Sequence, residues 1–155
     1  MSLRFACIHL ADEAATTAVA RQIAPRLRAG DTLLLEGPIG AGKTTFARAL
    51  IRARLGQPEE DVPSPTFTLV QTYQADDVEI WHCDLYRLLD SQDVLELGLD
   101  DAFATAICLI EWPDRLGADR PADALVCAFA ASADHHSLSL AGAAAWQSRL
   151  DDLHD

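Results

Sequence analysis

The sequence has few basic residues for its length. It contains 12 Lys and Arg residues against 24 Asp and Glu residues, a formal net charge of −12. Tight direct binding of RNA or DNA needs Lys and Arg side chains that neutralise phosphates. The composition therefore argues against a protein that grips nucleic acid, whereas a basic protein partner would be attracted by the acidic surface.

The sequence also lacks membrane and secretion signals. No run approaches the roughly 18 apolar residues of a membrane-spanning helix, and the opening MSLRFACIHLADE does not have the pattern of a signal peptide. No CxxC pair occurs, so we expect buried free thiols in a reducing compartment at Cys7, Cys83, Cys108 and Cys127. The 155 residues, half of them apolar, predict one cytoplasmic domain over 1–155 without membrane contact.

Apolar runs and helical patterns alternate along the chain. The runs at 31–36 and 106–111 are continuously apolar, as in central parallel strands that are buried on both faces. The segments 66–74 and 78–84 predict an antiparallel hairpin. Further strands are expected over 3–10, 123–131 and 135–141. Helices are expected over 12–27, 44–55, 90–97, 99–104 and 143–153, with Pro25 disturbing the first helix and Gly30 ending it.

Residues 37–44, GPIGAGKT, match the phosphate-binding pattern GxxxxGK(S/T) in full. An apolar strand precedes the motif and an amphipathic helix follows it, so backbone N–H groups and the helix dipole can face phosphates. We expect Lys43 to reach the β- and γ-phosphates, Thr44 to ligate Mg²⁺ and Thr45 to bond the α-phosphate. The remaining predicted nucleotide-binding residues of the loop are Gly37, Gly40, Ala41 and Gly42. Together with the element order, the motif predicts a three-layer α/β fold of the P-loop NTPase type with a mixed parallel and antiparallel sheet.

Two acids end predicted strands at the edge where open α/β sheets bind ligands. Asp84 is either a ligand of the P-loop magnesium or a cap of the next segment. Glu111 either orients or deprotonates the attacking water or is a surface acid. We select Lys43, Asp84 and Glu111 as candidate catalytic residues, with Thr44 and Asp84 as metal ligands.

Three other residues have two interpretations each. Thr66 and Thr68 belong either to a switch-like segment that senses the γ-phosphate through a hydroxyl group or to a β-branched strand. Trp112 is either close to the nucleotide or part of the core. No (N/T)KxD motif for guanine is present, which argues against a small GTPase.

The ordered motifs resemble the TsaE (YjeE) family of bacterial tRNA threonylcarbamoyladenosine biosynthesis. The resemblance runs from about residue 31 to about residue 117 and rests on LLLEGPIGAGKTTFARAL, SPTFTLVQTY, HCDLYRL and LIEWPDRLG. It implies that Asp84 coordinates magnesium, that Glu111 is required for ATP hydrolysis, that Trp112 lies near the nucleotide and that Thr66 belongs to a switch-like segment.

The resemblance also implies partners and a pathway. TsaE-like proteins act with TsaB and TsaD, and TsaD transfers threonylcarbamoyl to adenosine 37 of tRNAs that read ANN codons. A member of this family would meet tRNA only indirectly, which agrees with the acidic charge. Two alternatives stay open: a P-loop small-molecule kinase, although the acidic loop 57–65 lacks the Arg of a kinase lid, and an ATP sensor with negligible turnover.

Overall fold

A computed structural model describes residues 3–65, 68–87, 93, 96–133 and 136–153. Seven strands form one sheet in the order β1-β7-β6-β2-β5-β4-β3. The strands are β1 Leu3–Leu10, β2 Thr32–Glu36, β3 Val70–Gln74, β4 Glu79–Asp84, β5 Ile107–Glu111, β6 Leu125–Ala131 and β7 His136–Gly142. Four neighbours, β6, β2, β5 and β4, run parallel, while β1, β7 and β3 pair antiparallel with their neighbours. The predicted mixed sheet is thus confirmed.

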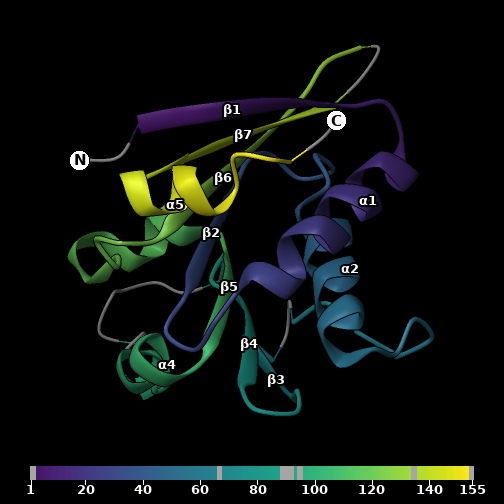
Figure 1. Cartoon of the computed structure of the whole chain (residues 1–155). Coiled ribbons are helices and arrows are strands. Elements are labelled where there is room, and N and C mark those ends of the chain that lie inside the picture. The colour runs from purple at the N-terminus through teal and green to yellow at the C-terminus, as the bar shows by residue number, and fades with distance from the viewer. Residues whose placement is uncertain (1–2, 66–67, 88–92, 94–95, 134–135, 154–155) are drawn as a thin grey trace.

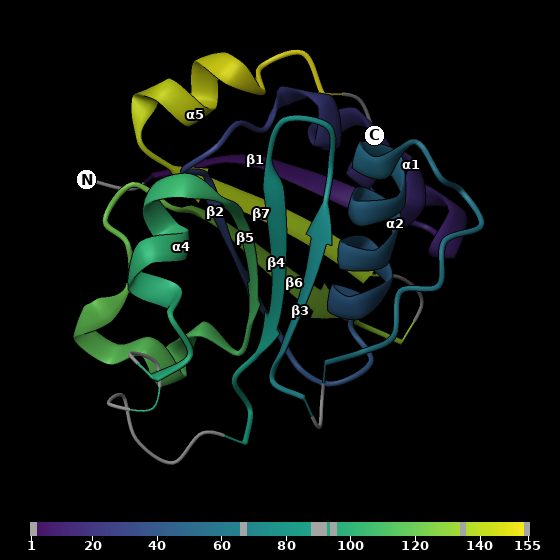
Figure 2. The same cartoon turned by 90° about the horizontal axis from the view of Figure 1, so that it is seen from below.

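Helices cover both faces of this twisted sheet (Figures 1 and 2). Helices α1 (Glu13–Ile23) and α2 (Lys43–Leu55) lie on one face. Helix α4 (Leu99–Thr105) and the 3₁₀ turns η2 (Pro113–Asp119) lie on the other. The side chains of β2 alternate accordingly, because Leu33 and Leu35 join the core cluster of α1 and α2, whereas Leu34 joins that of α4. This is the predicted three-layer arrangement.

The first helix is shorter than the sequence predicted. Its N-terminus is capped by Asp12, whose carboxylate accepts a 2.9 Å hydrogen bond from the backbone N–H of Ala15. The helix ends at Ile23 and not at Gly30. Pro25 lacks an N–H and converts the next residues into a 3₁₀ turn, η1 (Ala24–Arg26). Pro25 therefore ends the α-helix, whereas only a disturbance of its last turn was expected.

Other expectations need smaller corrections. Cys7 is exposed on the edge strand β1, whereas the other three thiols are buried as predicted. The strand expected from residue 66 begins only at Val70, after Leu69 with a positive φ of 69°. The last helix, α5 (Ala144–Arg149), is shorter than 143–153. Most of the helix expected over 90–97 lies outside the described residues, as do Thr66 and His135.

The loop that follows α2 is tied to the helix by two arginines. Arg48 donates its Nε–H to the carbonyl of Val62 at 2.8 Å, and Arg52 donates to the carbonyl of Glu60 at 2.9 Å. These bonds hold the acidic loop 57–65 along α2. No helix in the described part of the chain is long and apolar enough to cross a membrane.

Candidate nucleotide site

The loop between β2 and α2 has the backbone shape of a phosphate cradle. Gly37 has a φ of 133°, and a Cβ atom at this position would lie 2.4 Å from the carbonyl oxygen of Phe129, so only glycine fits. Gly42, with a φ of 108°, turns the chain into α2, which begins at Lys43. The first N–H groups of α2 have no partner within the helix and point toward the space in front of its N-terminus. An anion in that space would meet both the N–H groups and the helix dipole.

Lys43 is buried at the start of α2. Its ammonium group donates a 2.5 Å hydrogen bond to the carbonyl of Gly37 and lies 3.4 Å from the centre of the Trp112 ring. Burial lowers the pKa of Lys43, and the carboxylates of Glu111 and Asp84 oppose that shift. The side chain is therefore held close to the cradle by two contacts that a phosphate group can replace.

The two predicted acids are side by side. Strands β4 and β5 pair in parallel so that Asp84 lies opposite Glu111. The Asp84 carboxylate accepts a 3.0 Å hydrogen bond from the N–H of Tyr86, so it does cap the following turn. Burial nevertheless raises the pKa of Asp84, an effect opposed by this hydrogen bond and reinforced by Glu111.

Glu111 is only 3% exposed, which excludes the surface-acid interpretation. One carboxylate oxygen accepts a 2.9 Å hydrogen bond from the Thr44 hydroxyl, and the other lies 2.7 Å from Nε2 of His82. His82 was not among the site residues predicted from the sequence. The available signal was its spacing, because a residue two positions before Asp84 on a strand points to the same face.

A cavity of about 690 Å³ opens in front of these groups. Eight predicted site residues line it: Gly40, Gly42, Lys43, Thr44, Thr45, Asp84, Glu111 and Trp112. Gly37 shapes the turn behind the cavity, and Ala41 is fully buried. Other parts of the wall come from the start of α1, at Asp12 and Glu13, and from the turn between β6 and β7, at Ser132. The cavity thus extends well beyond a phosphate group.

Two aromatic rings form one side of the site. Tyr86 and Trp112 lie 4.8 Å apart between ring centres and are tilted by 50°. Trp112 directly follows Glu111 and has a φ of 60°, which turns the chain sharply after β5. Since its ring faces the Lys43 ammonium, Trp112 belongs to the cavity wall and is only partly buried.

The observed position of Thr68 does not support the switch-like interpretation. Thr68 is exposed, and its hydroxyl accepts a 2.9 Å hydrogen bond from the side-chain amide of Gln71. It is not among the residues that line the cavity, although Ser64, two positions before Thr66, is. The role of Thr66 and Thr68 stays a prediction.

The polar groups near the cradle fit Mg²⁺ better than a soft metal. No group of three or more His, Cys, Asp or Glu side chains with the arrangement of a metal site occurs within the described ranges. The Thr44 hydroxyl and the Asp84 carboxylate are hard oxygen donors that line the same cavity. Mg²⁺ commonly uses one or two such protein ligands together with substrate phosphates and water. The donor set is therefore compatible with the predicted magnesium site.

Comparison with known proteins assigns the chain to a family. The family model described as threonylcarbamoyl adenosine biosynthesis protein TsaE matches residues 10–138. The chain belongs to the TsaE family. The matched residues span the phosphate loop, the hairpin and both strands that carry the buried acids.

Several relatives carry the name tRNA threonylcarbamoyladenosine biosynthesis protein TsaE. The Rickettsia conorii protein is 41% identical over 105 residues, which are 68% of this chain and 59% of that protein. The Bacillus subtilis protein is 38% identical over 111 residues, 71% of this chain and 68% of that protein. The match to the first of these TsaE proteins therefore spans less than two thirds of its length.

The fold of this TsaE family member also matches a solved structure. The crystal structure of Bacillus subtilis YdiB aligns with a TM-score of 0.79 at 26% sequence identity and covers 98% of this chain and 95% of YdiB. The similarity extends over both flanks, including β1 and the strands after β5, for which the sequence motifs gave little information.

Proposed function

We propose that the protein is a Mg²⁺-dependent ATPase that acts in threonylcarbamoyl modification of adenosine 37 in tRNAs reading ANN codons. The observation that carries the proposal is the cluster at the phosphate loop, where the Thr44 hydroxyl, the Lys43 ammonium and two buried carboxylates meet at one cavity. A cavity of about 690 Å³ lies in the range of pockets that hold small ligands, which is roughly 300–1,000 Å³. Phosphoryl transfer needs this combination of positioning and charge stabilisation.

Each residue then has a defined task. The loop N–H groups and Lys43 bind the phosphates, and the ammonium exchanges its contacts with Gly37 and Trp112 for phosphate oxygens. Mg²⁺, when bound by Thr44 and Asp84, supplies positive charge that offsets the charge on the phosphates. Glu111 orients the attacking water and accepts its proton. The walls at Asp12 and Ser132 leave room for the ribose and the base.

The pathway assignment follows from family membership. Its relatives are named for tRNA threonylcarbamoyladenosine biosynthesis, and we infer that this chain works there with TsaB-like and TsaD-like proteins. A net charge of −12 suits a protein that meets protein partners and not the tRNA backbone. ATP hydrolysis is then a step in the cycle of the complex, and slow turnover is expected from the isolated chain.

The test is steady-state phosphate release from Mg-ATP by the protein alone and with purified TsaB and TsaD proteins from the same organism. A marked rise with the two proteins, absent for Lys43→Ala, is the expected result. Normal ATP binding without any rise would contradict the partner-driven cycle. Phosphate transfer to a metabolite mixture faster than hydrolysis would instead identify a kinase, and binding with negligible turnover under both conditions would identify a sensor.

A further inference from the structure

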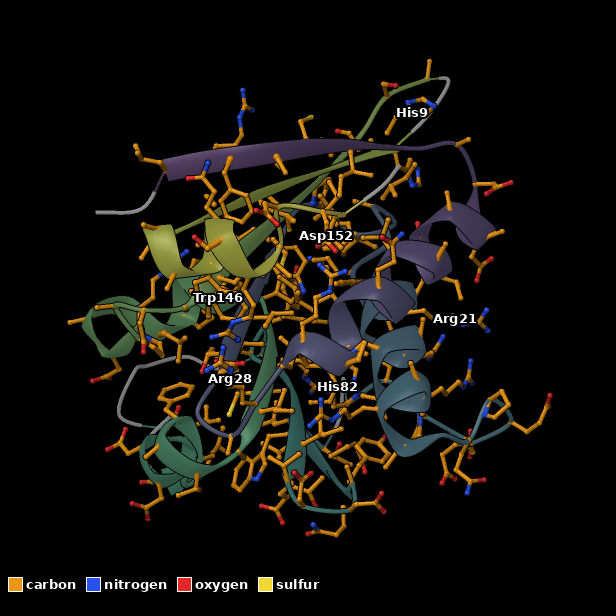
Figure 3. All side chains as sticks on the ribbon, viewed as in Figure 1. His9, Arg21, Arg28, His82, Trp146 and Asp152 are labelled. Atoms are coloured by element: carbon orange, nitrogen blue, oxygen red, sulfur yellow. The ribbon has the colours of Figure 1, made fainter. Side chains whose placement is uncertain are left out.

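His82 is a buried polar residue that the proposed reaction does not use. It lies on β4, two positions before Asp84, with no exposed surface. Figure 3 shows it in the interior of the molecule, on the side of the sheet that carries α2. Its Nε2 atom lies 2.7 Å from the Oε2 atom of Glu111. Because His82 is shielded from the cavity, it cannot touch a nucleotide directly.

The position of His82 is costly for the fold. Its Nδ1 atom is buried and has no hydrogen-bond partner among the described residues. Buried polar atoms without a partner are uncommon in folded proteins. A ring that donates from Nε2 to Glu111 leaves Nδ1 without a hydrogen, whereas an N–H at Nδ1 would be an unpaired donor. An apolar residue here would avoid this cost, so the contact with Glu111 explains why a histidine occupies the position.

The two oxygens of Glu111 have different partners. Oε1 accepts from Thr44, which lines the cavity, whereas Oε2 faces His82 in the interior. A ligand that recruits the Thr44 hydroxyl would free Oε1 but would leave the His82 contact intact. Oε1 would then face the cavity while Oε2 stays fixed.

We propose that His82 is a positioning residue for ATP hydrolysis, which holds Glu111 through Oε2 so that Oε1 is aimed at the attacking water. The inference rests on the proposed ATPase function. It predicts that His82 affects the rate of the chemical step and not the affinity for nucleotide. Removal of groups that orient metal-ligating side chains typically changes activity by about 10- to 100-fold, and we expect an effect of similar size for a group that orients Glu111.

The experiment compares His82→Ala and His82→Gln with the wild-type protein and with Cys83→Ala. Cys83 is the next residue on β4, is equally buried and points to the opposite face, so it controls for lost volume in this strand. The expected result for His82→Ala is a kcat that falls by about 10-fold or more with little change in the ATP dissociation constant measured by calorimetry. His82→Gln, whose amide can donate to Glu111, should recover part of the loss, and Cys83→Ala should keep the wild-type kcat.

A double-mutant cycle separates positioning from general damage. In the Glu111→Gln background, His82→Ala should cause no further loss of kcat, because its effect passes through Glu111. In the nucleotide-free protein, the urea midpoints of the same variants should be non-additive, which is a readout that needs no activity. Equal kcat for His82→Ala and wild type, or a full extra loss in the Glu111→Gln background, would overturn the inference while leaving the ATPase standing. Absence of Lys43-dependent hydrolysis in the wild type would overturn the proposed function and the inference together.

Discussion

The two ends of β2 are built differently. Before the strand, Asp31 accepts a 2.6 Å hydrogen bond from Arg149 of α5, and Arg26 pairs with Asp152. After the strand, Lys43 is buried with a lowered pKa, and Asp84 on β4 is buried with a raised pKa. At the first end, these charged side chains are paired with side chains of opposite charge. At the second end, the pKa shifts of Lys43 and Asp84 both favour the neutral form of the side chain.

This contrast separates residues that stabilise the fold from residues that wait for a ligand. A lowered Lys pKa and a raised Asp pKa both mean that folding disfavours the charged group, because burial removes it from water. Phosphates and a divalent cation would restore the lost interactions. We therefore expect substitutions before β2 to change stability and substitutions after β2 to change binding and catalysis.

The largest effect on binding is expected for Lys43→Ala. The change removes the cation at the cradle, and loss of a charged hydrogen bond costs roughly 1.5–3 kcal/mol, or about 10- to 100-fold in affinity for ATP. Calorimetric titration with ATP measures this directly. Arg54→Ala is the control at the other end of α2, because Arg54 donates to the carbonyls of Ala24 and Leu27. Equal ATP affinity for Lys43→Ala and wild type would show that the cradle does not bind phosphate.

Arg149→Ala tests the other end of the strand. The guanidinium group of Arg149 and the Asp31 carboxylate are both mostly buried, so the substitution should lower the free energy of unfolding by about 2 kcal/mol. Urea unfolding measures the loss, and ATP affinity should be unchanged. Arg28→Ala, in the same turn but exposed, should stay within about 0.5 kcal/mol of wild type. Similar free energies of unfolding for Arg149→Ala and Arg28→Ala would contradict the conclusion that residues before β2 stabilise the fold.

Asp84→Asn should stabilise the metal-free protein. Because the folded pKa of Asp84 is raised, its carboxylate destabilises the fold at neutral pH, and this penalty decreases as the pH falls through the folded pKa. The penalty is gone below the unfolded pKa of roughly 4, so the gain from Asn should vanish there. The Asn side chain keeps an oxygen for the N–H of Tyr86. Urea unfolding with a chelator at several pH values measures the gain, and a loss of stability at neutral pH would contradict the account.

The mildest test is thiol labelling of the native protein, because it needs no substitution. Only Cys7 is exposed, and burial raises the pKa of Cys108 to about 12, which leaves almost no thiolate at neutral pH. One fast-reacting thiol is expected with a disulfide reagent near pH 8, and four after unfolding in urea. Two or more fast thiols would show that the core around β4, β5 and β6 opens readily.

The phosphate loop was predictable because all its information is local. Residues 37–44, with the strand before them and the helix after them, define the backbone path and the place of Lys43 and Thr44. The ends of strands 31–36 and 106–111 were also close to those observed, since continuous apolar runs end where polar residues begin. The positive φ of Leu69, which delays β3, depends on a turn that no residue pattern marked.

The pairing of the acids was not predictable, because the sequence does not give strand order. Asp84 and Glu111 are 27 positions apart and meet only because β4 is the neighbour of β5. The spacing of His82 to Asp84 could have placed it on the same face of β4, but its contact with Glu111 on the adjacent strand depends on the strand order in the same way. The exposure of Cys7 likewise depends on β1 being an edge strand, which sequence alone did not decide.

The most direct test of the account is the comparison of Glu111→Gln with wild type in two measurements, ATP affinity by calorimetry and phosphate release from Mg-ATP. Removal of a preorganised charge at a transition state typically costs about 3 kcal/mol, or on the order of 10²-fold in rate. We expect such a loss of kcat with ATP still bound. A Glu111→Gln variant that hydrolyses ATP as fast as wild type would contradict the assignment of this buried carboxylate to the reaction.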